Sequence, residues 1–190
     1  MIIELTSIAD VWKTTSHPFY DERGNFAESF KESSVFHNTG KEFRIKQLSY
    51  SSSNKSVIRG VHYSLSPIPQ FKWITCIRGS ILDIVTDIRI GSETFGKSIS
   101  FELQAGDGVG VLILDRLGHS FHSREDGSVL SYALSTEYDP KYDRTINPLD
   151  KELNIPWPQG THILSLKDSN APTLIQLIEE SQLPLFSSSN

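Results

Sequence analysis

Short runs of β-branched and aromatic residues, separated by glycine-containing turns, fill the middle of the chain. Turn signals such as Arg78-Gly79-Ser80 and Glu125-Asp126-Gly127 stand between the runs. Many short strands with hardly any helix between them indicate an antiparallel sandwich or barrel. The runs that predict strands are 57–63, 71–79, 80–90, 97–104, 110–114, 119–123 and 128–136.

Helical patterns occur only near the two ends of the chain. Residues 33–40, SSVFHNTG, predict a short helix with a serine cap and a glycine stop. Residues 173–181, TLIQLIEES, place leucine and isoleucine at helical spacing after Pro172. The final residues 187–190, SSSN, are expected to be disordered. No repeat or linker divides the chain, so we expect one domain over residues 1–190.

Three predicted strands direct an ionisable side chain toward the same apolar interior. Because successive residues of a strand alternate faces, His62, Lys72 and Tyr132 each share a face with apolar neighbours. A buried polar group without a partner costs roughly 1–3 kcal/mol. Each residue alone fits a structural role: a satisfied core histidine, an edge lysine or a strand tyrosine. Together they favour proton removal next to a carbonyl, because imidazole can take the proton and ammonium can stabilise the resulting oxyanion.

The residues around His62 argue against a metal centre. A metal-binding barrel of this kind supplies His-x-His, a nearby acid and a further histidine on a later strand. Here Ser64 stands two positions after His62, no acid follows before Asp83, and only His119 remains as a distant ligand. We therefore expect no metal and no cofactor. Gly60, two positions before His62 on the same face, allows other groups to approach closely.

Other polar residues of the predicted strands fit structural roles. Asp83, Asp87 and Arg89 alternate within 80–90 and so share one face, where we expect a solvent-exposed row of charges. His122, in the segment GHSFHS, is expected to be an ordinary strand residue.

Composition and charge limit the class of protein. The 190 residues are 37% hydrophobic and carry a net charge of −5, so a nucleic-acid or anionic-membrane surface is not expected. The single Cys76 cannot form an internal disulfide, which fits the cytoplasm. The first residues, MIIELTSIADVWK, contain an acid and no apolar run, so we expect no secretory signal. No stretch approaches the roughly 18 apolar residues of a membrane span.

A set of segments resembles the dTDP-4-dehydrorhamnose 3,5-epimerase family. Each segment is weak alone, but they occur in the family's order and cover nearly the whole chain. The resemblance implies a double-stranded β-helix (cupin or jelly-roll) fold and a cofactor-independent epimerase acting on a nucleotide-linked 4-keto-6-deoxyhexose. The matching segments are FYDERGNFAESF (19–30), RGVHY (59–63), QFKW (70–73), VTDIRIGSETFGK (85–97), GHSF (118–121), Tyr132, YDP (138–140), IPWP (155–158) and LKDSNAP (166–172).

The resemblance also implies a role for individual residues. His62 would be the base that removes a proton next to the C4 ketone, oriented by Asp168. Lys72 would stabilise the enolate oxygen, and Tyr132 would return a proton from the opposite face. The family further implies a homodimer, in which residues near Arg23 reach the neighbouring subunit's site. The implied contacts to the nucleotide sugar are Arg59 and His119 at the diphosphate, with Arg23, Glu28, Gln47, Ser49, Tyr138, Asp143 and Lys167 around the rest.

The sequence departs from the family's pattern at the ends of the implied pocket. Residues 47–49 read Gln-Leu-Ser in place of Gln-Asp-Asn, the segment 114–121 differs, Asp143 replaces glutamate, and 147–150 read NPLD. With these changes, the sequence resembles branches of the family that act on modified deoxysugars, sometimes at C3 or C5 alone. The nucleotide, the sugar and the inverted centres therefore stay open. Alternatives are a sugar-nucleotide 3,4-ketoisomerase, a metal-dependent cupin dioxygenase and a non-catalytic sugar-nucleotide binder.

Overall fold

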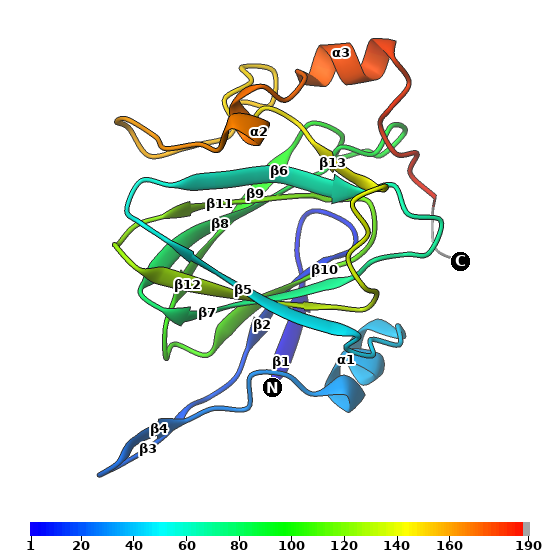
Figure 1. Ribbon diagram of the computed structural model, residues 1–190. Helices are drawn as coiled ribbons and strands as arrows, with labels where there is room; N and C mark the ends of the chain where they lie inside the picture. Colours follow the sequence, from blue (N-terminus) through cyan, green and yellow to red (C-terminus); the bar gives the residue numbers. More distant parts are fainter. Residues whose placement is uncertain (188–190) are drawn as a thin grey trace.

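The computed structural model describes residues 1–187, and all its strands except those of one small hairpin form two antiparallel sheets that face each other (Figure 1). The first sheet has the order β1 (Ile2–Leu5), β2 (Val11–Thr15), β10 (Val109–Ile113), β7 (Lys72–Arg78), β12 (Ser128–Leu134) and β5 (Gln47–Ser53). The second has the order β13 (Asp143–Thr145), β6 (Ile58–Ser64), β11 (Gly118–Ser123), β8 (Ser80–Thr86) and β9 (Ser98–Gln104). This is the predicted cupin-like β fold.

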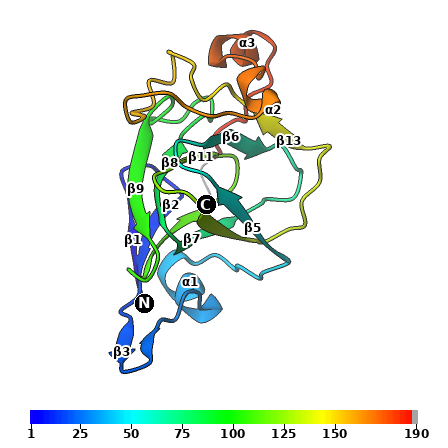
Figure 2. The same cartoon turned by 60° about the vertical axis from the view of Figure 1, so that its left-hand side comes forward.

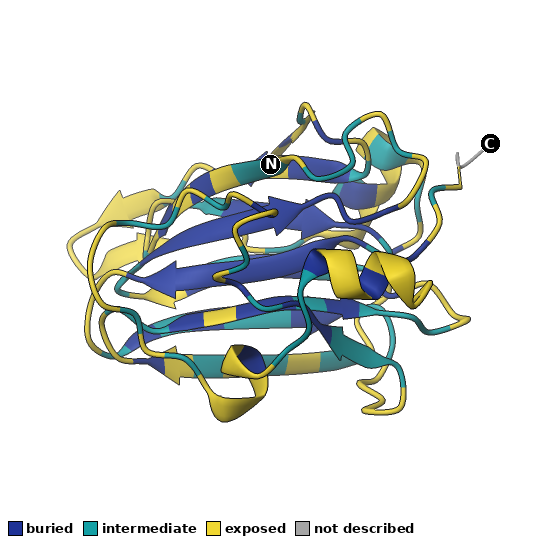
Figure 3. Ribbon diagram, turned by 90° about the horizontal axis from the view of Figure 1, so that it is seen from above, coloured by how far each residue is buried: buried dark blue, intermediate teal, exposed yellow. Residues whose placement is uncertain are grey.

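A hydrophobic core joins the inner faces of the two sheets. Ile74 and Leu130 from the six-stranded sheet pack against Val85, Phe101 and Phe121 from the five-stranded sheet. Figure 3 shows the central strands as mostly buried, whereas the helices are largely exposed. Since alternate residues of a strand face opposite sides, this packing fixes which residues of each strand point into the barrel.

Three short helices lie outside the barrel, one near the N-terminal strands and two over β6 (Figure 1). The predicted helix 33–40 is α1 (Glu32–Thr39), which ends at Gly40 in the left-handed conformation, as expected. The predicted serine cap is wrong, because Lys31 occupies the cap position without a side-chain hydrogen bond. The predicted helix 173–181 is α3 (Leu174–Glu179), which Thr173 starts with a capping box.

The C-terminal helices cover the outer face of β6. Leu174 and Leu177 of α3 pack with Val61 and Tyr63, which point away from the barrel interior. His62, between them in sequence, therefore faces inward. The shorter helix α2 (Leu166–Ser169) lies beside the same strand. Within residues 1–187, no helix combines the length and apolar character that crossing a membrane would require. The expected disorder at 187–190 falls mainly on residues 188–190, outside the described chain.

The acidic and basic residues of the predicted strand 80–90 are buried, so the expected solvent-exposed row of charges is wrong. Asp83 and Asp87 are 0% exposed, and Arg89 is 3% exposed. The strand β8 ends at Thr86, and Asp87 accepts hydrogen bonds from Arg89 in the loop that follows. Arg89 also donates to Asp10, 2.7 Å away and 79 positions distant in sequence. Burial is possible because each charge has a partner.

A small hairpin stands apart from the barrel. Its strands are β3 (Phe19–Asp21) and β4 (Gly24–Phe26), and it projects away from both sheets in Figures 1 and 2. All six strand residues are exposed. An isolated two-stranded hairpin has little stability of its own in water.

Candidate active site

His62 lies on β6 and contacts Asp168 of α2. Its Nε2 atom lies 2.7 Å from Oδ1 of Asp168. The side chain of His62 is 35% exposed and that of Asp168 is 4% exposed. Burial opposes ionisation of Asp168, but the hydrogen bond and charge of His62 lower its pKa below the ordinary value. An ionised Asp168 accepts the Nε2 hydrogen, which leaves the other ring nitrogen of His62 free to take a proton.

Two local features hold this pair in place. Gly60 has a φ of +124°, and a Cβ at this position would lie 2.4 Å from Cβ of Ser120 on β11. The close approach predicted at Gly60 is therefore confirmed. On the other side, Ser165 caps α2 and accepts a hydrogen bond from the backbone N–H of Asp168 at 3.1 Å. The carboxylate thus extends from a fixed helix start.

Lys72 begins β7 in the facing sheet and points toward His62. Its Nζ atom donates to the backbone oxygen of His62 at 3.4 Å. Ile74 and Cys76, on the same face of β7, are buried, in agreement with the predicted inward orientation. Burial lowers the pKa of Lys72, and the nearby carboxylates, Asp143 first, oppose that shift. The ammonium is therefore partly desolvated, and its charge is favoured by carboxylates in its surroundings.

Tyr132 lies on β12, beside β7, and is packed against the barrel core. Its hydroxyl lies 3.0 Å from Oγ of Ser51 on β5. Burial raises the pKa of Tyr132 well above its usual range. The phenol is therefore neutral and holds its hydrogen at physiological pH.

His119 connects these residues within the barrel. It lies opposite His62 in the register of β11 and β6, and its ring meets that of Tyr132 edge-on at 6.0 Å. Nε2 of His119 lies 2.7 Å from Oδ2 of Asp83. The other oxygen of Asp83 is buried and has no hydrogen-bond partner among the described residues. The two sheets thus bring His62, Lys72, Tyr132 and His119 together.

A second group of predicted site residues forms a linked cluster beside this centre. Oε1 of Gln47 accepts from the backbone N–H of Tyr138 at 2.7 Å, and Nε2 of Gln47 donates to Oγ of Ser49 at 2.9 Å. The hydroxyl of Tyr138 donates to Asp143 at 3.2 Å, and Asp143 is also paired with Lys167. Tyr138 lines a groove of about 680 Å³ with Ser64 and Gln70. Arg59 donates to Oγ of Ser53 at 3.0 Å.

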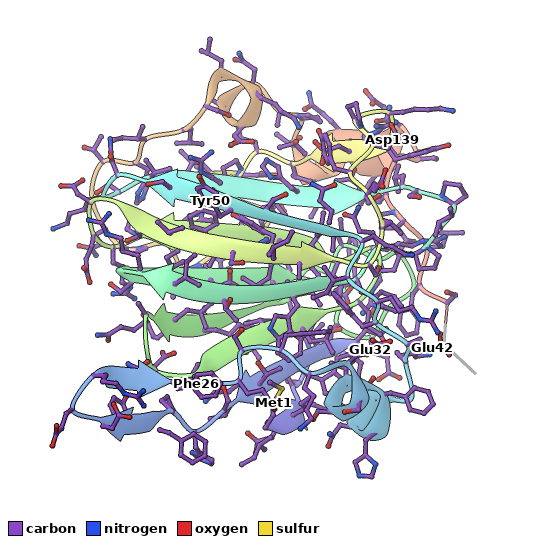
Figure 4. The ribbon with its side chains drawn as sticks, turned by 60° about the horizontal axis from the view of Figure 1, so that its bottom comes forward. Met1, Phe26, Glu32, Glu42, Tyr50 and Asp139 are labelled. Carbon is purple, nitrogen blue, oxygen red and sulfur yellow. The ribbon has the colours of Figure 1, made fainter. Side chains whose placement is uncertain are left out.

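Arg23 and Glu28 are not brought to this centre within one chain. Arg23 lies at the turn of the projecting hairpin, where its side chain is 89% exposed and paired with Asp21. Glu28 follows the hairpin and pairs with Lys31 at 3.3 Å. Figure 4 shows Phe26 of the same hairpin below the barrel strands.

The predicted residues did not include three side chains that contact the site. Asp83, expected in solvent, holds His119, while Ser51 and Ser53 hold Tyr132 and Arg59. The serines gave no signal, because their segment lacks the apolar alternation of a strand. Among the described residues, no group of three or more His, Cys, Asp or Glu side chains is placed to hold a metal ion.

A family model described as dTDP-4-dehydrorhamnose 3,5-epimerase matches residues 5–176. The chain belongs to this epimerase family. Its members are isomerases, and this chain is 36% identical to the dTDP-4-dehydrorhamnose 3,5-epimerase of Mycolicibacterium smegmatis over 181 residues, which cover 95% of this chain and 89% of the relative. The family predicted from the sequence is thereby confirmed.

Solved structures of this epimerase family share the fold closely. NovW, a 4-keto-6-deoxy sugar epimerase of Streptomyces spheroides, matches with a TM-score of 0.95 and 33% identity, over 98% of this chain and 94% of NovW. ChmJ, a 3'-monoepimerase of Streptomyces bikiniensis solved with dTDP-quinovose, matches with a TM-score of 0.93 and 35% identity, over 96% of this chain and 92% of ChmJ.

Proposed function

We propose that this protein inverts C3, C5 or both centres of a dTDP-linked 4-keto-6-deoxyhexose by removing and returning a proton, in deoxysugar biosynthesis. The observation that carries the proposal is the convergence of an oriented imidazole, a partly buried ammonium and a neutral phenol: His62, Lys72 and Tyr132. Membership of a family whose relatives are named 3,5-epimerases and 3-epimerases supports the same reaction class. A cytoplasmic location, expected from the single Cys76, stays a prediction.

Proton removal is assigned to His62. A hydrogen on the carbon next to a ketone is acidic, because the electron pair left behind spreads onto the ketone oxygen. Asp168 fixes the tautomer of His62 and stabilises the imidazolium that forms when the proton is taken. A positioned base of this kind contributes about 10²–10⁴-fold to the rate.

Stabilisation of the enolate is assigned to Lys72. Its ammonium lies 3.4 Å from the backbone oxygen of His62, and we assign it to the ketone oxygen on the carbon next to the one that loses its proton. A positive charge held in a partly desolvated site stabilises a developing oxyanion more strongly than it would in water.

Proton return is assigned to Tyr132, which lies on the sheet opposite His62. Removal by a group on one sheet and return by a group on the other inverts the carbon between them. The phenol is suited to this step because burial keeps its hydrogen in place until the enolate forms.

Binding of the nucleotide diphosphate is assigned to the residues around this centre. Arg59 and His119 supply positive or hydrogen-bonding groups for the diphosphate, and Tyr138 offers an exposed ring at the groove that it lines with Ser64 and Gln70. Gln47, Ser49, Asp143 and Lys167 surround Tyr138 and fix its position. ChmJ, which was solved with dTDP-quinovose, supports a dTDP-linked substrate.

We further propose a homodimer in which the projecting hairpin reaches the neighbouring site. The hairpin exposes three aromatic side chains, namely Phe19 (74%), Tyr20 (71%) and Phe26 (72%). Exposed apolar groups gathered on one element mark an interaction surface. Arg23 at its tip would then meet the partner's substrate, which accounts for its distance from His62 in the single chain.

The proposed function is tested by deuterium incorporation. The protein is incubated in D₂O with dTDP-4-keto-6-deoxyglucose, and deuterium at C3 and C5 is followed by NMR. We expect incorporation at one or both carbons with the ketone still at C4, and none with His62→Asn. A ketone that moves to C3 would indicate a ketoisomerase. Absence of exchange with dTDP-, GDP- and CDP-linked 4-keto sugars alike would overturn the proposal.

A further inference from the structure

The inner face of the edge strand β5 carries a row of hydroxyl groups, and each one contacts a residue of the candidate site. Alternate residues of β5 are shielded from solvent, so Ser49, Ser51 and Ser53 share the inward face. Ser53 accepts from Arg59, Ser49 accepts from Gln47, and Ser51 contacts Tyr132. Of the three, Ser51 contacts the residue to which we assign proton return.

The register of the sheet places Ser51 beside the phenol. Tyr132 lies opposite Ser49, and Ser51 lies opposite Leu130. Ser51 is therefore the diagonal neighbour of Tyr132 on the same face, a position that an aromatic side chain can reach. The two hydroxyl oxygens lie 3.0 Å apart, and within residues 1–187 this is the only hydrogen bond of the Tyr132 hydroxyl.

We propose that Ser51 is a positioning residue that donates a hydrogen bond to the Tyr132 oxygen and so directs the phenol hydrogen at the substrate carbon. This inference rests on the proposed function. The distance allows either hydroxyl to be the donor. A phenol that donated to Ser51 would point its hydrogen away from the substrate, so proton return requires Ser51 to be the donor.

The same hydrogen bond supports the step in which the proton is delivered. The Tyr132 O–H bond breaks, and a C–H bond forms with the electron pair of the enolate, whose oxygen returns to the ketone. The Tyr132 oxygen is left with a negative charge. Burial raises the pKa of Tyr132 and the charge of Asp83 raises it too, whereas the hydrogen bond from Ser51 lowers it. Ser51 therefore stabilises the phenolate until water restores its hydrogen.

The test separates proton removal from inversion. In D₂O, His62 can return deuterium to the face from which it took hydrogen, which labels the sugar without inverting it. The native protein, Ser51→Ala, Ser51→Thr and Ser52→Ala are compared with dTDP-4-keto-6-deoxyglucose, and labelled unchanged substrate and inverted product are measured separately. Ser52 lies on the exposed face of the same strand and serves as the matched control.

We expect Ser51→Ala to lower the rate of inversion by roughly 10- to 100-fold, the effect of a hydrogen bond to a charged group. Labelling without inversion should persist, so the ratio of labelling to inversion rises. Ser51→Thr should restore inversion because it keeps the hydroxyl, and Ser52→Ala should match the native protein. Thermal melting checks that the variants are folded.

Two results would overturn the inference. One is a Ser51→Ala protein that inverts the sugar at the native rate. The other is an equal loss of labelling and inversion that Ser51→Thr does not restore, which would indicate a structural role. Failure of the proposed function can be distinguished from failure of this inference, because the native protein itself would then show no deuterium exchange.

Discussion

His62 and Asp168 lie 106 positions apart in sequence, yet their side chains meet at 2.7 Å. The barrel supplies the imidazole from β6, and a four-residue helix outside the barrel supplies the carboxylate. Asp168 is nearly inaccessible to water, whereas His62 keeps an open side. The imidazole of His62 is thus oriented by an element that does not belong to either sheet.

Replacing this carboxylate should impair proton removal without displacing the ring. We expect Asp168→Asn to lower the exchange rate by about 10²–10⁴-fold, since the amide no longer fixes the tautomer or stabilises imidazolium. Deuterium incorporation measures the rate, and Glu179→Gln on the exposed face of α3 is the control. Native rates in Asp168→Asn would contradict the assigned role.

The same substitution should change how stability depends on pH. The folded pKa of Asp168 lies below its ordinary value of 3.8. The stability that the ionised group contributes is therefore present above that value and is lost as the pH falls through the lowered pKa. The difference in melting temperature between the native protein and Asp168→Asn should therefore shrink as the pH falls below 3.8. A difference that stays constant would show that Asp168 does not titrate in this way.

Lys72 should set the alkaline limit of the reaction. The assigned role needs the ammonium form, and burial lowers the pKa of Lys72 from its ordinary value. Activity should therefore fall as the pH rises through a value below 10.5. Asp115→Asn should move that limit to still lower pH, because a carboxylate that favours the ammonium is removed. Lys72→Met should remove most of the activity, and the activity that remains should no longer fall at this alkaline pH. An unchanged pH profile in Lys72→Met would exclude the assigned role of Lys72 in stabilising the enolate.

The buried charge network at Arg89 should be important for stability. Arg89→Leu leaves Asp87 buried without its partner, which typically costs about 3–5 kcal/mol in the free energy of unfolding. Arg124→Leu breaks an exposed pair with Glu102 and should cost about 1 kcal/mol or less. Urea denaturation measures both. Equal effects of the two substitutions would show that burial of the first pair has no energetic consequence.

Mixing two inactive variants tests the proposed dimer. Arg23→Ala keeps His62, and His62→Asn keeps Arg23. After subunit exchange in an equimolar mixture, half of the dimers contain one subunit of each variant. If the hairpin reaches the neighbouring site, each of these dimers has one site with both native residues and one site with neither. An equimolar mixture should then regain about a quarter of native activity. Activity that does not rise on mixing, with a monomer in light scattering, would contradict the shared site.

The sequence predicted the strands β6 to β12, but it did not predict β1 to β4, β13 or, beside the candidate site, β5. Its segment QLSYSSS has serines at the inward positions, so no hydrophobic periodicity distinguishes it from a loop. Strand parity correctly placed Lys72 and Tyr132, because Ile74 and Leu130, two positions away from them, are buried in the core. The residues two positions from His62 are Gly60 and Ser64, so its inward orientation is established by the outward packing of its neighbours Val61 and Tyr63. The loop after β8 was misread for a different reason. Besides Asp87, Arg89 pairs with Asp10, and a contact between residues so distant in sequence leaves no local pattern.

The placement of His62 and Tyr132, the two groups to which we assign proton transfer, on separate sheets has a mechanical consequence. His62 belongs to the five-stranded sheet and Tyr132 to the six-stranded sheet, and the two sheets are held apart by core side chains such as Ile74 and Phe121. The packing of these core side chains sets the distance between the two sheets, and with it the distance between His62 and Tyr132 in which a sugar carbon must fit. Residues that never touch a ligand thereby determine which carbon fits, and trimming a methyl group deep in the barrel should alter selectivity before it alters folding.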